Sequence, residues 1–175
     1  MTNRIATIED QLLVIDAQGG SRVALEELVR RWYARLWQHA RRLTSDPHAA
    51  WDITQKSWYD IIIGLRRLKD PAHFQAWAYK ITTHRAMDWL RTWQRRQCRP
   101  LCSVEPPCEV DDDSSDVKEA LLQLKENSRL VLVLYYWEHL SVAEISIVLE
   151  IPAGTVKSRL HKAREELKAL WDHIP

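Results

Sequence analysis

Glycine is scarce in this 175-residue sequence, which has four glycines against nine tryptophans and contains no glycine-rich loop that could cradle a phosphate. A nucleophile elbow and a His-Glu metal-binding helix are also missing, and the carboxylates are scattered over predicted helix faces. The sequence therefore lacks the common signatures of an enzyme, and we expect no catalytic residues. Few glycines and only seven prolines also leave room for long helices.

Two further absences concern membranes and disulfides. The longest strongly apolar run, Val131–Trp137, is far shorter than the roughly 18 residues that a membrane span needs. Residues 1–17 show no charged-then-apolar signal peptide, so we expect a cytoplasmic protein without a membrane span. The odd number of cysteines, Cys98, Cys102 and Cys108, implies no disulfide framework. Zinc needs four ligands at tighter spacing, so we expect reduced thiols and no metal or other cofactor; a redox or metal response of these thiols stays an alternative.

The formal net charge of +1 conceals an uneven distribution. Residues 65–100 hold nine basic and two acidic side chains, whereas residues 101–116 hold no basic and six acidic ones. The remaining parts, residues 1–64 and 117–175, are each balanced at eight of either sign. Because the local field rather than the sum attracts a polyanion, the basic block is a candidate nucleic-acid surface.

The stretch Ser141–Leu170 predicts two short helices joined by a tight turn. Ser141 and Glu144 form a capping-box pattern, and Pro152 and Gly154 favour a turn between the helices. The second helix has one apolar face, consisting of Val156, Leu160, Ala163, Leu167 and Leu170, and a polar face consisting of Lys157, Ser158, His161, Lys162 and Arg164. This arrangement is typical of a helix-turn-helix whose second helix enters the DNA major groove. An ordinary helical hairpin with a solvated basic face is the alternative.

The N-terminal half predicts four helices, over residues 8–18, 21–43, 46–63 and 70–97. Ser21 is a candidate N-cap, and Asp46-Pro47 and Asp70-Pro71 each combine an N-cap with proline at the first helical position. His39 lies on an apolar stripe, where a hydrogen-bonded core histidine is expected rather than a ligand. The third helix has an inner face of Ala50, Ile53, Ser57 and Ile61 and an outer face of Asp52, Gln55, Lys56 and Tyr59.

The helix predicted over residues 70–97 combines cations with aromatic side chains. One face carries Lys80, His84, Met87, Arg91 and Arg95, flanked by Arg85, Trp89 and Trp93. Cations that track phosphates and rings that stack on unpaired bases together suit single-stranded nucleic acid. A solvated face beside core tryptophans is the alternative.

These patterns define an all-α fold class: two small helical bundles joined by a flexible acidic linker, with the helix-turn-helix in the C-terminal bundle. Residues 98–115 have no apolar period and contain the run Asp111–Asp113, so they form the predicted linker. The bundles then cover residues 1–97 and 116–175. In the second bundle, a helix around Leu121 and Leu124 and another through Leu130–Trp137 precede the helix-turn-helix.

The order of these features resembles a known family. The strings are LEELVRRWYARLWQHARRL at 25–43, DPHAAWDITQKSW at 46–58, FQAWAYKITTHRAMDWLR at 74–91 and LSVAEISIVLEIPAGTVKSRLHKAREEL at 140–167. They are similar to extracytoplasmic-function (ECF, group 4) sigma factors of the sigma-70 family of bacterial RNA polymerase, which contain only regions two and four. The resemblance implies a transcription initiation factor that directs core RNA polymerase to a promoter and helps to melt it.

The resemblance implies roles for three sets of residues. The set matching the helix that docks on the clamp helices of the polymerase is Asp52, Gln55, Lys56 and Tyr59. The set matching the part that binds the −10 element is Arg66, Arg67, Lys69, His73, Lys80, His84, Arg85, Asp88, Arg91 and Arg95. The set matching the helix that faces the −35 element is Thr155, Lys157, Ser158, Arg159, His161, Lys162 and Arg164, of which Arg159 and Arg164 are expected on phosphate or in pairs within the unit.

The implied partners are core RNA polymerase, through its largest and second-largest subunits, promoter DNA, and an anti-sigma factor. Trp51 and Lys56 stand where the family usually has acidic residues, His84 where it often has asparagine, and Glu150 where it usually has glycine. These departures suggest an unusual promoter choice or an additional partner. A stand-alone helix-turn-helix regulator and a thiol or metal sensor are the competing hypotheses.

Overall fold

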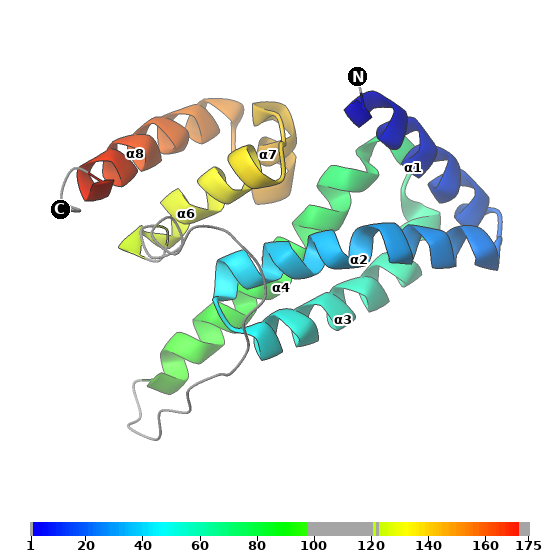
Figure 1. Ribbon diagram of the computed structural model, residues 1–175, viewed down its shortest axis with the longest axis horizontal. Coiled ribbons are helices and arrows are strands. Elements are labelled where there is room, and N and C mark those ends of the chain that lie inside the picture. Colours follow the sequence, from blue (N-terminus) through cyan, green and yellow to red (C-terminus); the bar gives the residue numbers. More distant parts are fainter. Residues whose placement is uncertain (1, 98–120, 122, 172–175) are drawn as a thin grey trace. The chain divides into compact units, whose positions relative to one another are not determined.

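The computed structural model describes residues 2–97, 121 and 123–171, and the regular structure in these residues is entirely helical (Figure 1). The chain divides into two compact units, Met1–Leu101 and Cys102–Pro175. The predicted all-α fold class is therefore confirmed over the described residues. The predicted linker, residues 98–115, and the start of the helix expected before Leu121 lie outside them.

The N-terminal unit contains four α-helices and two short 3₁₀ turns. They are α1 (Thr2–Gln18), α2 (Arg22–Thr44), α3 (Pro47–Gly64), η1 (Leu65–Arg67), η2 (Pro71–His73) and α4 (Phe74–Gln97). Helices α2, α3 and α4 pack against one another, and α1 packs against α2 and the two turns. Trp32 lies at the centre of the core, where its ring meets Phe74 edge-on at 5.3 Å and Tyr79 at 5.9 Å.

The helix starts predicted from local sequence are confirmed for α2 and α3. The Ser21 hydroxyl accepts a hydrogen bond from the Ala24 N–H at 3.3 Å. The Asp46 carboxylate accepts from the N–H groups of His48 at 2.8 Å and Ala49 at 3.1 Å. Each such cap stabilises its helix by about 1 kcal/mol because it satisfies backbone donors that have no partner inside the helix.

His39 is the core residue that its position predicted. It is fully buried, and its Nε2 lies 2.8 Å from the Thr83 hydroxyl, which joins α2 to α4. Its ring also packs edge-on against Tyr79 at 5.0 Å. A hydrogen-bonded histidine inside the core satisfies its polar atoms without a metal.

The predicted α-helical start at Asp70-Pro71 is wrong. Asp70 does cap the segment, accepting from the Ala72 N–H at 2.9 Å, but Pro71–His73 form a 3₁₀ turn and the α-helix begins only at Phe74. The His73 N–H donates to the Asp70 carbonyl at 3.1 Å, and this three-residue bond closes the tighter turn. Proline after an N-cap therefore predicted a helical turn here but not its type.

The C-terminal unit contains α6 (Glu126–Leu132), the π-helical turn η3 (Val133–Trp137), α7 (Val142–Leu149) and α8 (Ala153–Trp171). The helix expected through Leu130–Trp137 is α-helical only to Leu132, because a π turn forms the rest. The Glu138 N–H donates to the Val133 carbonyl, five residues back, at 3.1 Å. The four residues 131–134 are all buried, whereas Tyr136, near the end of the π turn, is 48% exposed.

The helix-turn-helix is formed as predicted. The Glu144 N–H donates to the Ser141 hydroxyl at 3.2 Å and the Ser141 N–H donates to the Glu144 carboxylate at 2.8 Å, which completes the capping box of α7. On α8, Val156, Leu160 and Ala163 are buried, whereas Leu167 is half-buried. Glu150 ends α7 in the left-handed conformation, with φ 55° and ψ 40°.

Candidate functional site

Helix α8 presents most of the predicted −35 set to solvent. Lys157, Ser158, His161, Lys162 and Arg164 are exposed, and Thr155 and Arg159 are half-buried. The turn before α8 sets its start, because the N–H groups of Thr155 and Val156 both donate to the Pro152 carbonyl, at 2.8 and 3.1 Å. The packed side and the polar side of α8 do not share residues, so the polar side is available for a ligand.

Arg164 contacts another element of its own unit, the π turn η3. Its Nε–H donates to the Tyr136 hydroxyl at 3.0 Å. Its guanidinium lies 5.5 Å from the ring centre of Tyr135 and 5.7 Å from that of Tyr136. From the sequence, Arg164 was expected either on a DNA phosphate or in a pair within the unit. Its contact with Tyr136 is of the second kind.

Helix α4 carries a stripe of exposed or half-buried basic side chains. At about 100° per residue, Lys80, His84, Arg91 and Arg95 fall on one side of the helix. Two other members of the predicted −10 set are paired: Arg85 donates to the Asp60 carboxylate of α3 at 2.6 and 2.8 Å, and Asp88 lies 3.3 Å from Arg91. Arg85 is thus partly neutralised by α3.

The connector between α3 and α4 is fixed from two sides. The Gln18 side chain donates to the carbonyls of Leu65 at 2.8 Å and Leu68 at 2.7 Å. Gly64 lies directly under Trp77, where an added Cβ would come within 2.8 Å of the indole. The predicted −10 residues of this segment, Arg66, Arg67, Lys69 and His73, are all exposed, and the His73 ring nitrogen lies 3.1 Å from Asp70.

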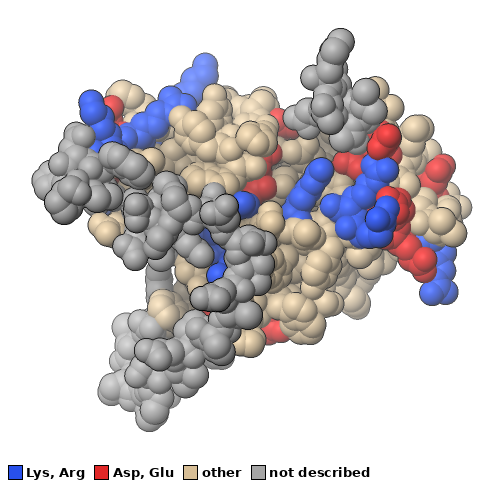
Figure 2. All heavy atoms as spheres, in the orientation of Figure 1, with Lys and Arg blue, Asp and Glu red and all other residues tan. Residues whose placement is uncertain are grey.

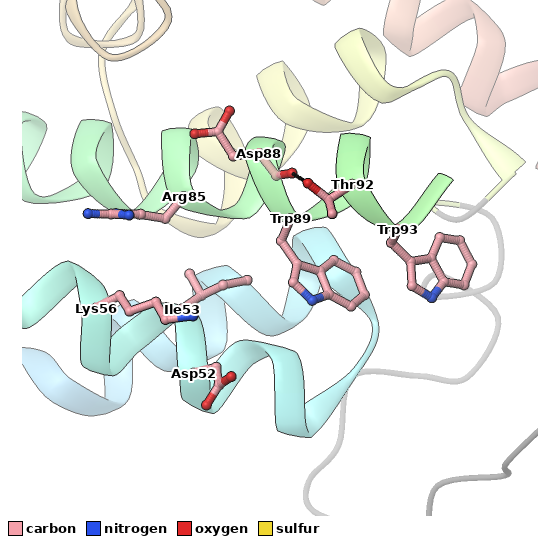
Figure 3. Close-up of a pocket in the computed structure, with 8 residues that line it drawn as sticks. All are labelled: Asp52, Ile53, Lys56, Arg85, Asp88, Trp89, Thr92 and Trp93. Atoms are coloured by element: carbon pink, nitrogen blue, oxygen red, sulfur yellow. Dashed lines mark hydrogen bonds between the residues drawn. The ribbon is translucent and has the colours of Figure 1, made fainter. Parts of the chain in front are cut away.

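A groove of about 380 Å³ lies between α3 and α4 (Figure 3). Its lining residues are Asp52, Ile53, Lys56, Arg85, Asp88, Trp89, Thr92 and Trp93. The indoles of Trp89 and Trp93 stack with centres 5.9 Å apart and planes 16° apart, and both point to the α3 side of α4.

The predicted interleaving of these indoles with the cations is wrong. Trp89 and Trp93 lie about half a turn around α4 from Arg91 and His84. The tryptophan on the stripe's side is Trp77, which is half-buried and packs against Phe74 with ring centres 6.3 Å apart. A count of residues at 100° per residue separates the two sides and could have found this.

The outer face of α3 is confirmed as exposed for the predicted polymerase-binding residues Asp52, Gln55, Lys56 and Tyr59. Tyr59 is 67% exposed and Trp51, on the same face, is 53% exposed. Ile62 and Ile63 add apolar surface beside them and were not predicted. Exposed apolar side chains rimmed by polar ones are typical of a protein-binding surface.

Other charged side chains of the N-terminal unit pair with one another. Arg31 joins α2 to α1 through Glu9 at 2.8 Å, and both Arg30, at 2.7 Å, and Arg31, at 2.9 Å, contact Glu27. Hydrogen bonds from Arg30 and then Arg31 lower the pKa of the Glu27 carboxyl to about 2. In Figure 2, basic and acidic spheres accordingly lie intermixed over the α1 and α2 part of this view.

Within the described residues, no group of three or more His, Cys, Asp or Glu side chains is arranged to hold a metal ion. Cys98, Cys102 and Cys108 lie outside this part of the chain. None of the described helices has both the length and the apolar character needed to cross a bilayer.

Comparison with known proteins agrees with this geometry. Residues 28–97 match the family model of Sigma-70 region 2, and residues 114–167 match that of Sigma-70, region 4. The RNA polymerase sigma-E factor of Streptomyces coelicolor is 30% identical over 86% of this chain and 89% of its own length. The ECF RNA polymerase sigma factor SigE of Mycolicibacterium smegmatis is 31% identical over 89% of this chain, which spans 65% of that relative.

Two solved structures share the fold. CnrH, in complex with the cytosolic domain of CnrY, is 25% identical with a TM-score of 0.73 and covers 95% of this chain and 99% of its own. The sigma factor RpoE of Bartonella quintana, in complex with the anti-sigma factor NepR, is 20% identical with a TM-score of 0.70 over 86% of this chain and 98% of its own.

The two-unit helical fold, with the helix-turn-helix in the second unit, defines a transcription initiation factor with sigma-70 regions 2 and 4. The chain belongs to the sigma-70 family of RNA polymerase sigma factors, and within it to the extracytoplasmic-function group.

Proposed function

We propose that this ECF sigma factor binds core RNA polymerase through the outer face of α3 and contacts the promoter at two places, the −10 element with α4 and its connector and the −35 element with α8. Region 2 is assigned to residues 1–97, the linker to 98–115 and region 4 to 116–175. The observation that supports this best is that each unit exposes polar and basic side chains along one side of a helix: the basic stripe of α4, which is exposed or half-buried, and the polar side of α8. These roles are binding roles, and we expect no catalytic activity.

The α3 surface supports the polymerase contact. Trp51 and Tyr59 expose apolar area next to Asp52 and Gln55, so a partner helix could bury aromatic rings in the centre while carboxylate and amide groups pair at the edge. We expect this contact to be with the largest subunit, with the second-largest subunit contacted elsewhere on the protein. The protein would then act in the cytoplasm, where the polymerase works.

The DNA contacts have different characters. On α8, Lys157, Ser158 and His161 lie near the N-terminal end, the end that a recognition helix points at base edges. On α4, cations lie beside Trp77, and this arrangement suits single-stranded DNA with unstacked bases. The cations can bind the phosphates while the indole ring stacks on a base. Extracting a base costs a few kcal/mol, and these contacts would offset that cost.

An anti-sigma factor is the remaining proposed partner. The Bartonella quintana structure that shares this fold is a complex with an anti-sigma factor. We expect a comparable inhibitor to compete with polymerase for the exposed apolar face of α3.

The test is reconstitution with core RNA polymerase. The wild-type protein should co-elute with the core enzyme, and the holoenzyme should enrich promoters with −35 and −10 elements from a random DNA library. Lys157→Ala should weaken −35 selection, whereas Lys168→Ala, an exposed lysine in the last turn of the same helix, should not. Tyr59→Ala should weaken co-elution. A protein that selects DNA equally well without polymerase would be a stand-alone regulator, and this proposal would be wrong.

A further inference from the structure

Three side chains of the C-terminal unit form a compact cluster outside the predicted base-contacting residues. Tyr135 and Tyr136, at the end of η3, meet edge-on with ring centres 5.0 Å apart and planes at 78°. The Arg164 guanidinium, from α8, lies 5.5 and 5.7 Å from the two ring centres and donates Nε–H to the Tyr136 hydroxyl at 3.0 Å. The cluster is at the surface, since Arg164 is exposed and Tyr136 is 48% exposed.

The cluster orients Arg164 without neutralising it. Arginine donates through five N–H groups in one plane, and the Tyr136 hydroxyl takes one of them, so four remain on the two terminal nitrogens. Exposed arginines of the N-terminal unit, such as Arg30 and Arg85, contact a carboxylate instead. Within the part of the chain that the structure describes, no ion pair of Arg164 with a carboxylate is present. A full positive charge is therefore held in a fixed direction at the surface.

The position of Arg164 on α8 suggests its ligand. It follows Lys157 by seven residues, which places it on nearly the same side of the helix and about 10.5 Å further along the axis. If Lys157 points at base edges, a residue two turns later lies at the edge of a major groove that is about 12 Å wide. The edge of the groove is lined by phosphates, and a guanidinium with two free terminal nitrogens matches a phosphate in a bidentate manner.

We propose that Tyr136 is a positioning residue for promoter binding: it holds the Arg164 guanidinium ready for a DNA phosphate beside the −35 major groove. The inference rests on the proposed contact between α8 and the −35 element. Tyr136 does not touch DNA in this arrangement. The Tyr136 hydroxyl and the Tyr135 ring restrict the rotamers of Arg164 before DNA binds. The arginine side chain therefore loses less conformational entropy when it contacts a phosphate.

The experiment uses the holoenzyme and a duplex promoter taken from the library that the wild-type holoenzyme enriches, with Kd measured over a range of salt concentrations. Arg164→Ala should weaken binding to all −35 sequences equally and reduce the slope of log K against log salt by about 0.9, the value for one lost phosphate contact. Tyr136→Phe, which keeps the ring, should weaken binding by about threefold to tenfold, the effect of one lost hydrogen bond. Tyr136→Phe should have no further effect when Arg164 is already alanine.

The inference is overturned by an unchanged salt slope in Arg164→Ala or by unchanged binding in Tyr136→Phe. It is also overturned by a Tyr136→Phe loss that persists in the double variant, which would indicate a merely structural role. Thermal unfolding of each variant separates a folding defect from a positioning effect, because Tyr136→Phe should leave the melting temperature nearly unchanged. The Lys157→Ala variant separates the positioning role of Tyr136 from the proposed contact between α8 and the −35 element. If Lys157→Ala weakens −35 binding and Tyr136→Phe does not, only the positioning role fails; if the wild-type holoenzyme ignores the −35 sequence, the proposed function fails as well.

Discussion

Replacing Glu150 by glycine should stabilise the C-terminal unit. Glu150 closes α7 with φ 55° and ψ 40°, and its N–H and that of Ile151 both donate to the Ser146 carbonyl. This αL closure satisfies the Ser146 carbonyl near the helix end, and glycine is the residue that adopts it without a steric penalty. Glu150 stands where the family usually has glycine, and its left-handed conformation lowers the stability of the unit relative to glycine at this position.

The expected gain follows from two opposing terms. A residue with a Cβ in the left-handed region costs about 1–2 kcal/mol relative to glycine. Glycine returns about 0.5–1 kcal/mol of this because it loses more conformational freedom on folding. The net gain is about 0–1.5 kcal/mol in the free energy of unfolding, or about 0.75 kcal/mol at the midpoints of the two terms. That corresponds to a rise of a few degrees in melting temperature for a unit of this size.

The assay should report the C-terminal unit alone. Hydrogen exchange of the Val148 and Leu160 amides does so, because both residues are in the core of this unit. The matched control is Glu150→Ala, since it removes the same carboxylate but keeps the left-handed strain, and Glu150→Asn should fall between the two because asparagine tolerates this conformation. If Glu150→Gly proves no more stable than Glu150→Ala, the strain argument is refuted.

Three further changes test the packing, the faces and the charges. Leu160→Ala should destabilise the C-terminal unit by about 2–5 kcal/mol through the cavity it leaves, whereas Lys157→Ala should leave the melting temperature of the unit unchanged. An equal fall in melting temperature for both variants would contradict the assignment of faces on α8. Gly64→Ala should destabilise the N-terminal unit by about 1–3 kcal/mol in urea denaturation, because its Cβ would come within 2.8 Å of an indole, while Gly154→Ala, which faces open space, should not. Glu27 has a lowered pKa of about 2, so its stabilising contribution is complete above about pH 4.5 and is lost as the pH falls through 2. Glu27→Gln should therefore make the free energy of unfolding depend less on pH between about 2 and 4.5. Denaturation at several pH values measures this.

The sequence predicted those parts of the fold that depend on neighbouring residues. Ser21, Asp46 and Ser141 each cap a helix through side-chain bonds that reach only two or three residues, so the pattern alone identifies them. The π turn at 133–137 depends instead on what surrounds an apolar run, and periodicity carries no information on that. The 3₁₀ turn before Phe74 could not be predicted either, because proline after an N-cap fits an α-helix and a 3₁₀ helix equally well.

The candidate site divides in the same way. The polar side of α8 could be predicted because a helix with one buried apolar stripe exposes the residues on its opposite side. The aromatic residues of α4 were misplaced because their positions were not counted around the helix. At about 100° per residue, Trp89 and Trp93, which face the groove, fall opposite the cations, whereas Trp77 falls on the cationic side.

The exposed side of α8 and the exposed side of α3 should respond differently to substitution, because they differ in how much apolar surface they carry. On α8 the buried residues Val156 and Leu160 carry the fold, and Lys157 and His161 carry the proposed recognition, so changes in the second pair should alter promoter preference with little loss of stability. On α3 the exposed side includes Trp51, a large apolar ring that the unit's own fold leaves uncovered. A substitution there changes both the affinity for a partner and the apolar area left in water, because one ring serves both. Under the proposed assignment, −35 preference should change through substitutions on α8 with little loss of stability, whereas a substitution of Trp51 should alter the affinity of α3 for polymerase.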